Sequence, residues 1–546
     1  MTAAPPSADT PPNPGPAAPG PATRTDRLLA AVAGILAGYG GLAVATVAAV
    51  LVRPEAGPVA AVGDAVVDRT PAGVKDWAIR TFGESDKAVL SFGILVLLTL
   101  LAAALGGLAL RRRAAALTGV AVLGAAGALA AVTRPDSESL TDAWPSLTGA
   151  AAAALLLHLL VRRLPSARTA PPPPWAAGWR SAPRTDRRSF LVAGAGVAVG
   201  ATGAMILARS VGSTRSEHAA ASRNALRLPK PASPAPAVPP GAQLDVPGIS
   251  PFVTPDRDFY RVDTALVVPR VDADTWRLRV HGAGVARERE FTLADLMRRE
   301  VVERDITLAC VSNEVGGPYV GNARWLGVRL ADLLRACGVR PPSAGGTADQ
   351  LVARSVDGMT IGSPVEDVMD GRDALLAFGM NGEPLPFAHG FPVRMVVPGL
   401  YGYVSACKWI SSIELTTFAA YDAYWVPRGW SAQAPVKTES RIDTPRPFSR
   451  PKAGTVAVAG VAWAQHRGIS KVEVRVDDGP WQEAELGAED SRDTWRQWVH
   501  RWQATPGDHT VAVRATDGTG ALQTEARADT MPNGATGWHA VSVTVE

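Results

Sequence analysis

One cysteine stands where a reactive or metal-binding thiol is expected. Cys310 ends the strand-like run "RDITLAC" and is followed by "VSNEVGG", a polar and glycine-rich turn. A thiol at the mouth of a strand, beside backbone that can approach a ligand closely, is suited to metal ligation or to nucleophilic attack. A buried structural cysteine fits the same residues, so this stretch alone leaves both interpretations open.

The other two cysteines carry weaker signals. Cys337 lies on the apolar side of a predicted helix and is expected in the core, whereas Cys407 fits either a core or a site position. The sequence has no CxxC pair and no cluster of histidines and cysteines. This pattern favours neither a disulfide framework nor a zinc site.

A second stretch, "MNGEPLPFAHGFPVRMVVPGLYGYVSACKW" (residues 380–409), gathers groups that can bind an anion. Arg394 and Lys408 could clamp a phosphate, the first through its planar fork and the second as a point charge. His389 could donate to a neighbouring oxygen. Ordinary surface charge is the alternative, but glycines and prolines, rather than a solvated helix, frame His389 and Arg394.

Two kinds of element must position these side chains. Residues 252–417 alternate strand-like runs such as "WRLRV" (276–280) with helical patterns such as "TLADLMRREV" (292–301), which predicts a mixed α+β domain. From about residue 445, short alternating strands with Asp-Gly turns predict an all-β sandwich of roughly 100 residues.

The chain upstream is predicted to lie in a membrane. Apolar runs, most of them near the roughly 20 residues that cross a bilayer, occur at 28–51, 88–110, 114–132, 147–161 and 190–208. Arg24 and Arg27 place the N-terminus inside, and arginine-rich loops follow the second and fourth runs. Five crossings from an inside N-terminus leave everything after Ala208 outside.

The segment "DRRSFL" (residues 186–191) directly before the fifth run fits the twin-arginine export pattern. Arg187 and Arg188 would be its paired arginines. Two further positive-inside residues are the alternative interpretation. A signal of this kind is read by the pathway that moves folded proteins, so it predicts a downstream domain that folds inside the cell.

Composition narrows the classes of partner and cofactor. The net charge of +4 and the pI near 9.0 come partly from loop arginines, so we expect no nucleic-acid binding. His158 is the single histidine of the apolar runs, whereas a membrane b-type haem normally needs a pair of axial ligands. With no haem or iron–sulfur motif in the sequence, we expect neither cofactor.

The motifs together resemble one enzyme family. "LACVSNEVGG", "GNARWLGVRLADLL", the 380–409 stretch and the "FYR" and "VDADTWRLRVHG" pieces are similar to the sulfite oxidase family of molybdenum enzymes, and "NGEPLP..HGFPVR.VVPG" is the most specific part. The resemblance extends from about residue 252 to the C-terminus. It implies that the β-sandwich, with "RWQATPG" and "GWHAVSV", is the family's immunoglobulin-like dimerisation domain, so that the protein could form a homodimer.

The resemblance also implies roles for individual residues. Cys310 matches the thiolate that binds molybdenum beside the two sulfurs of one molybdopterin, and Arg261 matches an arginine that points into the substrate pocket; both are predicted catalytic residues. His389, Arg394 and Lys408 match residues that hold the pterin and its phosphate. The remaining cofactor-binding candidates are Phe259, Tyr260, Arg261, Asp357, Ala406 and Cys407.

Two departures from the family pattern bear on the substrate. Asp263 stands where animal and plant enzymes have a histidine. Glu314 and Val315 occupy the two arginine positions of the family's "AGNRR" motif. Loss of a cation and gain of a carboxylate disfavour a small dianion such as sulfite, so a neutral or larger substrate such as a sulfoxide or N-oxide fits at least as well.

The predicted protein is a multi-domain, membrane-tethered molybdopterin oxidoreductase with its catalytic domain on the extracytoplasmic side of the cell membrane and a separate redox partner. Sulfite dehydrogenase is the alternative activity, and a cofactor-free cell-surface binding protein is the alternative class. The predicted organisation is a disordered tail (1–24), four transmembrane helices (25–163), a cytoplasmic loop with the twin-arginine motif (164–189), a fifth transmembrane helix (190–209), a Pro/Ala-rich linker (210–245), an α+β sulfite-oxidase-like molybdopterin domain (246–420) and an immunoglobulin-like domain (421–546).

Overall fold

The computed structural model describes residues 24–53, 56–70, 74, 81, 86–134, 137, 139–164, 187–265 and 267–546. Residues 1–23 of the predicted tail and residues 165–186 of the predicted cytoplasmic loop lie outside the described residues. The chain divides into two compact units, Met1–Gly212 and Ser213–Glu546. Each unit is described by itself.

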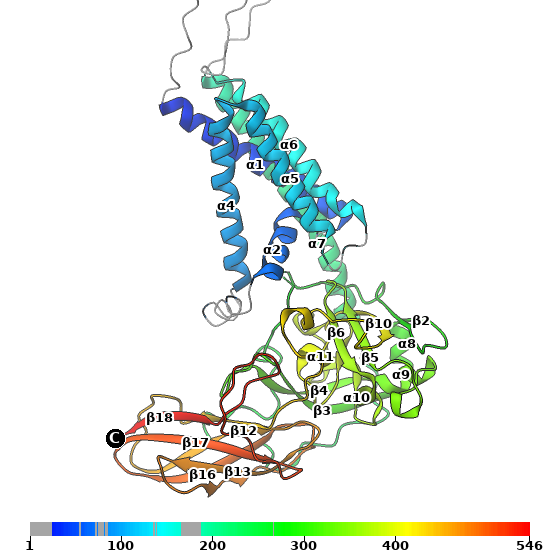
Figure 1. Cartoon of the computed structure of the whole chain (residues 1–546), viewed down its shortest axis with the longest axis vertical. Coiled ribbons are helices and arrows are strands. Elements are labelled where there is room, and N and C mark those ends of the chain that lie inside the picture. Colours follow the sequence, from blue (N-terminus) through cyan, green and yellow to red (C-terminus); the bar gives the residue numbers. More distant parts are fainter. Residues whose placement is uncertain are drawn as a thin grey trace, which may run out of the picture. The chain divides into compact units, whose positions relative to one another are not determined.

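The first unit is built from apolar helices (Figure 1). Ala and Leu, which are strong helix formers, dominate their sequences. Apolar residues surround each long helix instead of forming one stripe, as is typical of helices in apolar surroundings. The helices are α1 (Arg24–Val52), α2 (Pro58–Arg69), α4 (Asp86–Ala109), α5 (Arg113–Val132), the 3-10 turn η3 (Leu140–Ala143), α6 (Trp144–Val161) and α7 (Arg187–Ala225), whose last part belongs to the second unit.

Five helices in the described part of the chain are long and apolar enough to cross a membrane. They fall on the five runs that the sequence predicts. Their bounds are Arg24–Val52, Ala88–Ala109, Arg113–Val132, Leu140–Val161 and Arg188–Ala208.

Small residues let these helices approach closely. A Cβ added to Gly34 of α1 would lie 2.0 Å from the carbonyl oxygen of Ala102 in α4, so only glycine fits there. Two ion pairs tie the connecting segments together, Arg53 to Asp142 at 2.9 Å and Arg134 to Asp64 at 2.6 Å.

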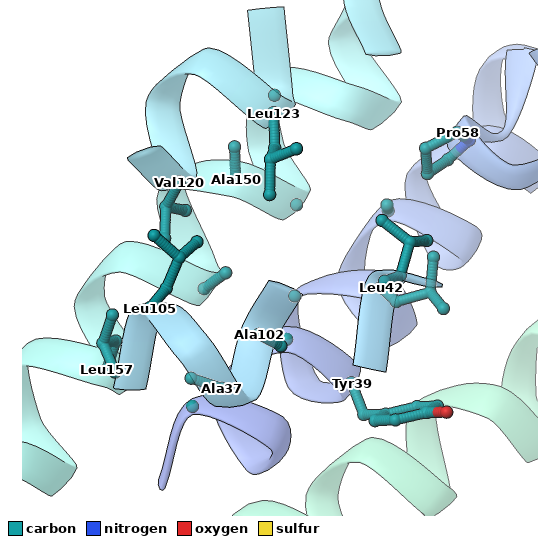
Figure 2. A pocket seen from close by; sticks show the side chains of 18 of the residues that line it. Ala37, Tyr39, Leu42, Pro58, Ala102, Leu105, Val120, Leu123, Ala150 and Leu157 are labelled. Carbon is teal, nitrogen blue, oxygen red and sulfur yellow. The ribbon is translucent and has the colours of Figure 1, made fainter. Parts of the chain in front are cut away.

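An apolar cavity of about 150 Å³ lies between α1, α4, α5 and α6 (Figure 2). Leucines and alanines form most of its wall, and Tyr39, whose hydroxyl bonds Thr99 at 2.9 Å, lies at its edge. No side chain with a formal charge, no histidine and no cysteine is among the described residues that line it. The polar groups that the described lining offers are hydroxyls, those of Tyr39, Thr99 and Ser146.

The second unit begins with one mixed sheet, one antiparallel sheet and short helices (Figure 1, green to yellow). One sheet has the order β2-β1-β10-β5-β6, with β1 and β10 parallel, and the other has the order β3-β4-β7-β8, with β9 paired to β7. The strands are β1 (Arg277–Gly282), β2 (Arg289–Thr292), β3 (Val301–Ala309), β4 (Val320–Arg329), β5 (Gln350–Ser355), β6 (Thr360–Pro364), β7 (Leu375–Met380), β8 (Glu383–Pro384), β9 (Arg394–Val396) and β10 (Ile410–Thr416).

Short helices link these strands: α8 (Leu293–Met297), α9 (Leu330–Ala336), α10 (Val365–Met369) and α11 (Gly402–Ser405). The ST-x-x-D pattern read in the sequence forms a capping box at the start of α8, where Thr292 and Asp295 satisfy each other's backbone donors. Cys337, at the end of α9, is buried in the core as predicted.

Two four-stranded sheets complete the second unit. Their orders are β11-β12-β16-β15 and β14-β13-β17-β18, and residues of both sheets share one hydrophobic core. This two-sheet arrangement agrees with the predicted all-β part; its immunoglobulin-like identity stays a prediction. The strands are β11 (Glu439–Thr444), β12 (Gly454–Trp463), β13 (Ile469–Val476), β14 (Gln482–Glu483), β15 (Glu485–Leu486), β16 (Arg496–Ala504), β17 (Gly507–Asp517) and β18 (His539–Val545).

Residues 210–245 differ from the predicted linker. Helix α7 continues to Ala225, and the Pro-rich segment after it lies along the edge of β3, where Ala232 N–H donates to the Val301 carbonyl at 2.8 Å and Glu303 N–H to the Ser233 carbonyl at 2.9 Å. Proline lacks an amide donor, but Ala232 and Ser233 between the prolines can pair with an open strand edge. The composition of this segment predicted a linker, because composition carries no information about backbone hydrogen bonds to a distant strand.

The two all-β sheets also hold β3. Thr307 of β3 donates its amide to the Asp493 carbonyl at 2.9 Å, and its hydroxyl oxygen accepts the Trp495 amide at 2.8 Å. Trp463 and Trp495 belong to the same hydrophobic core as residues of the first two sheets. Residues 246–420 and 421–546 therefore pack as one compact unit.

Candidate functional site

Cys310 lies directly after β3, where the strand opens into the loop of residues 311–319. Its amide donates to the Tyr319 carbonyl at 2.9 Å, and its carbonyl accepts the Asn313 amide at 3.1 Å, so both ends of the loop are closed on the cysteine. Burial raises the pKa of the thiol, while hydrogen bonds from Ser312 and the charge of Lys408 oppose that rise. A buried thiol held at a strand end matches the position predicted for a metal ligand.

Arg394 is a buried cation at the start of β9. Its guanidinium lies over the ring of Trp325 with 4.9 Å to the ring centre, and its Nη1 donates to the His389 carbonyl at 3.1 Å. Its Nε has no hydrogen-bond partner, and no described carboxylate forms an ion pair with it. Burial lowers the pKa of Arg394 to about 10, so the charge remains at neutral pH without an anion to compensate it.

His389 ends the 3-10 turn η7 (Phe387–His389) that follows the "NGEPLP" segment. Its Nε2 lies 2.9 Å from the Asp256 carbonyl, which makes this nitrogen the donor. Burial, followed by the charge of Arg394, lowers the pKa of His389 to about 4. The ring is therefore neutral at physiological pH and can act toward a ligand only as a neutral group.

Lys408, Asp263 and Arg261 form one charged group. The Asp263 carboxylate, 4% exposed, accepts from Lys408 Nζ at 2.7 Å and from Arg261 Nε at 2.8 Å. Burial lowers the pKa of Lys408 to about 8, and the contact with Asp263 opposes this effect. Asp263, which the sequence marks only as a departure from the family pattern, thus pairs with two of the predicted site cations.

Aromatic rings connect the cysteine to the cations. Phe259 meets Trp325 edge to face at 5.8 Å and His389 at 5.5 Å, and it stacks on Tyr260 at 5.2 Å between ring centres. Burial raises the pKa of Tyr260, with the nearby Cys310 adding to the rise. The phenol therefore stays protonated. The "FYR" segment, which is not part of a strand, therefore brings Phe259 to His389 and Tyr260 near Cys310 and Arg394.

Asp357 lies in the turn between β5 and β6 and accepts the Met359 amide at 3.3 Å. Burial raises the pKa of its carboxyl group, which also interacts with Asp263 and Lys408. The Ala406 amide donates to the Gly402 carbonyl, and the Cys407 carbonyl accepts the Met395 amide at 2.8 Å. These hydrogen bonds leave fewer backbone groups of Ala406 and Cys407 for a ligand.

One glycine makes the cluster compact. Gly390, with φ of 110°, follows His389 in a conformation that few other residues adopt. A Cβ there would lie 3.0 Å from Cβ of Arg394 and 3.2 Å from Cα of Lys408. The glycine therefore allows the segments that carry these three side chains to pack against one another.

The residues present fit an anionic, phosphate-bearing cofactor. The cluster has the unpaired buried cation of Arg394, the cations Arg261 and Lys408, and an Asn313 Nδ2 donor that is buried without a partner. Among the described residues there is no group of three or more His, Cys, Asp or Glu side chains that could hold a metal by themselves. A cofactor that brings further sulfur ligands would complement the single thiol of Cys310.

The comparisons with known proteins agree with this chemistry. Residues 265–425 match the oxidoreductase molybdopterin-binding domain family. The mitochondrial sulfite oxidases of Rattus norvegicus and Homo sapiens are each 31% identical over 291 residues, which cover 45% of this chain and 52% of those proteins. NADH nitrate reductase 1 of Oryza sativa subsp. japonica is 34% identical over 197 residues, which cover 32% of this chain and 21% of that protein.

The chain spans about half the length of the curated sulfite oxidases it matches. Among solved structures, the sulfane dehydrogenase SoxCD from Paracoccus pantotrophus aligns with a TM-score of 0.47 and 23% identity, covering 55% of this chain and 84% of that chain. Residues 265–425 form a molybdopterin-binding oxidoreductase domain. Over the matched residues the chain is similar to sulfite oxidases, which confirms the resemblance to that family of molybdopterin-dependent oxidoreductases read from its motifs.

Several residues of the cluster were not singled out from the sequence. Trp325 supports Arg394, the Asp256 carbonyl accepts from His389, and Asn313 closes the cysteine loop by accepting the Tyr319 amide at 2.8 Å. β4 is buried along most of its length instead of on alternate residues, so periodicity alone does not single out Trp325. The contact of Asp256 depends on chain segments 133 residues apart, for which the sequence gives no signal.

The predicted export residues lie in the other unit. Arg187 and Arg188 form the first turn of α7, and Arg188 is exposed. The side chain of Arg187 lies outside the described residues.

Proposed function

We propose that this protein is a membrane-tethered molybdenum–molybdopterin oxidoreductase that acts on the extracytoplasmic side of the membrane. The single observation that carries the proposal is the buried, uncompensated Arg394 cation in the cluster that also holds His389, Lys408 and the strand-end thiol of Cys310. Such a cation is costly without an anion beside it. A pterin phosphate would supply that anion.

Each residue of the cluster would have a separate role toward the cofactor. Cys310 would provide the protein's thiolate to the metal, and Arg394 and Lys408 would hold the phosphate. Because neutral His389 donates its Nε2–H to the Asp256 carbonyl, its Nδ1 would be left to accept a hydrogen bond from an N–H of the pterin. Phe259 and Tyr260 would form an apolar wall that excludes water. When bound, a molybdenum–molybdopterin supplies two-electron, oxygen-atom-transfer chemistry.

Charge in the cluster supports a neutral substrate. Asp263 already pairs with Arg261, and Glu314 stands in the loop after Cys310. Both carboxylates weaken the attraction for a dianion. A sulfoxide or N-oxide would accept two electrons and two protons and leave as a sulfide or amine plus water, with the electrons supplied by a reduced quinone or a separate redox protein.

Sulfite dehydrogenation is the second candidate, because the relatives named sulfite oxidase share this domain. In that direction sulfite and water would give sulfate, two protons and two electrons, which an external acceptor must take up. The nitrate reductase relative is named for a reduction. Similarity to these relatives therefore leaves the direction open, and the charge at Asp263 and Glu314 favours reduction of a neutral oxide.

The location rests on the apolar helices and on the arginines. Five helices suited to a bilayer support a membrane location, and with the arginine-rich loops kept inside, the positive-inside rule would put the second unit outside the cell. Arg187 and Arg188 would direct its export after folding. The electron carrier is a separate molecule that approaches from the membrane or from outside, and the all-β part could join two copies into a homodimer.

Molybdenum and pterin analysis of the purified full-length protein tests the class. We expect one molybdenum and one pterin per chain. A protein that folds but carries neither would instead be a cofactor-free binding protein at the cell surface, and the enzyme proposal would be wrong.

A Cys310→Ser variant tests the assigned ligand. Changing a residue that only supports a metal ligand typically lowers metal affinity or activity by about 10- to 100-fold. Because Cys310→Ser replaces the ligand itself, we expect turnover to fall by more than about 100-fold. Cys337→Ser, a change in the core, is the matched control and should keep full turnover once folded. Unchanged activity of Cys310→Ser would refute the assignment.

An activity screen separates the two directions. Loaded enzyme would be offered dimethyl sulfoxide, methionine sulfoxide and trimethylamine N-oxide with a reduced viologen dye, and sulfite with ferricyanide. The charge argument predicts higher kcat/KM for the neutral oxides than for sulfite. The opposite order would favour sulfite dehydrogenase.

A further inference from the structure

The loop after Cys310 is short, internally bonded and shaped by one glycine. Besides its closure at Cys310, its Gly317 amide donates to the Glu314 carbonyl at 2.8 Å. Gly316 has φ of 80°, a conformation that disfavours a side chain. Because Glu314 and Val315 stand on this loop within five positions of Cys310, its placement decides what a substrate meets beside the thiol.

Arg441 of β11 holds this loop from the all-β part. Its Nη1 donates to the Gly317 carbonyl at 2.9 Å, and its Nη2 donates to Ser250 Oγ at 3.0 Å. Asp443, two residues along the same strand, accepts from Arg441 Nε at 2.7 Å and from the Ser250 amide at 2.9 Å. Three partners thus fix all three nitrogens of a guanidinium that is only 11% exposed.

The ring of His539 in β18 packs against Gly316 of the loop. A Cβ added to Gly316 would lie 2.2 Å from Cδ2 and 2.3 Å from Nε2 of the ring. The ring is itself fixed, because its Nδ1 accepts the Ile442 amide at 3.0 Å. Burial lowers the pKa of His539 to about 4, so the ring meets the loop as a neutral, flat surface.

From these contacts we infer that Arg441 and His539 are positioning residues, which hold the 311–319 loop so that Glu314 and Val315 form a fixed wall of the substrate pocket next to Cys310. The inference rests on the proposed function, because the loop can line a substrate pocket only if the protein is an enzyme. It gives the all-β part a role in substrate selection. The contacts to Gly316 and Gly317 involve backbone only, so they place the loop whatever side chains it carries.

Hydrogen exchange of the loop amides tests the placement without any turnover. The full-length protein in detergent would be compared with Arg441→Met, Arg441→Lys and the exposed control Arg446→Met. Losing a charge-assisted hydrogen bond should raise the exchange of peptides covering 311–319 by about tenfold in Arg441→Met. Arg441→Lys should lie between Arg441→Met and the wild type, and Arg446→Met should match the wild type.

Kinetics show whether the placement matters to substrate. With dimethyl sulfoxide and reduced viologen as the probe, Arg441→Met should raise KM by about tenfold and change kcat far less, since the arginine does not touch the reacting atoms. Partial return of KM in Arg441→Lys would distinguish positioning from a general loss of stability. If Arg441→Met does not fold, both the hydrogen exchange of the loop and KM would be measured on Arg441→Lys.

The steric contact gives an independent test. Gly316→Ala should raise the exchange of the loop amides, through the clash with His539 and the strain of a side chain at φ of 80°, and His539→Ala should raise it because the loop loses the ring that packs against Gly316. Unchanged exchange and KM in Arg441→Met, or unchanged exchange in His539→Ala, would overturn the inference. Wild-type protein without molybdenum would refute the proposed function, yet the exchange data would still decide the placement.

Discussion

Arg394 shows how a single buried charge prepares a site for its ligand. The guanidinium has Trp325 on one side and a carbonyl at one nitrogen, but no carboxylate. We therefore expect Arg394→Met to stabilise the cofactor-free protein by about 1–3 kcal/mol, because it removes an uncompensated charge. The same change should reduce the molybdenum and pterin content of protein made with cofactor supply.

Arg372 is the matched control for this prediction. It is also largely buried, but it pairs with Asp367 at 3.1 Å and Asp370 at 2.7 Å. Arg372→Met leaves these carboxylates unpaired, so it should lower the free energy of unfolding without a specific loss of cofactor. Denaturant unfolding of the cofactor-free variants provides the comparison, and a destabilised Arg394→Met would contradict the argument.

Glu439, at the start of β11, predicts a dependence of stability on pH. Burial raises the pKa of its carboxyl group to about 8 from the ordinary 4.5. Between these values only the unfolded chain releases the proton, so Glu439 lowers the stability of the protein as pH rises through this window. Glu439→Gln carries no such proton and should be more stable than the wild type by about 3 kcal/mol at pH 7.

The difference between Glu439→Gln and the wild type should vanish near pH 4, where both side chains are neutral in either state. Thermal unfolding at several pH values between about 4 and 8 measures it. Glu525→Gln, at an exposed position, is the control and should show no such trend. A constant difference across this range would argue against a neutral Glu439.

Residue types in the cluster were more predictable than their partners. Cys310, His389, Arg394 and Lys408 stand in motifs whose spacing and loop residues are informative by themselves. The pairing of Lys408 with Asp263 spans 145 residues, and it exists only because two distant segments pack together. Sequence reasoning could note that Asp263 was unusual, but not that it binds two cations.

At the scale of elements, the last turn of α7 is built into the cofactor domain. Arg223 donates from Nε to the Leu385 carbonyl at 2.8 Å and from Nη2 to the Pro384 carbonyl at 2.7 Å. These carbonyls belong to the segment that leads into His389. Arg223, which composition put in the predicted linker of residues 210–245, thus holds a loop of the candidate site.

Arg223→Met should loosen that loop. Loss of two charge-assisted bonds in a half-buried place should lower the free energy of unfolding by about 2 kcal/mol and reduce the retained pterin. Pterin content and denaturant unfolding of the purified protein measure both effects. Arg227→Met, one turn further along the chain and exposed, is the control. Equal behaviour of the two variants would show that Arg223 has no special role.

The elements themselves were predicted to different degrees. The five apolar helices and the alternating strands follow from composition and periodicity, which act locally. Residues 226–245 were predicted as a linker because proline and alanine carry no local strand signal. Their order comes from the open edge of β3, to which Ala232 and Ser233 bond, and this edge is a property of the folded sheet.

At the scale of the whole molecule, the export hypothesis makes the sharpest prediction. Changing Arg187 and Arg188 together to lysine preserves charge but removes the twin-arginine signal. We expect residues 213–546 of this variant to stay inside the cell. Protease added to intact cells should then digest this part of the wild type and spare that of the variant.

Arg162→Lys with Arg163→Lys is the matched control, because it makes the same chemical change outside the motif. That control should leave the second unit accessible to protease. If both double variants were digested like the wild type, the two arginines would be ordinary positive-inside residues, and the domain would cross the membrane by another route.

The bonds around β3 also set an order in time. Cys310 and β3 are synthesised before the residues that contact them. The hydrogen bonds of Thr307 can form only after Asp493 and Trp495 have been made, and the loop after Cys310 can pack only after His539 has been made. The ribosome must therefore translate as far as His539 before the surroundings of the Cys310 thiol are complete. A cofactor held by these surroundings would be bound only after that point, so the export hypothesis requires a second unit that is folded before it crosses the membrane.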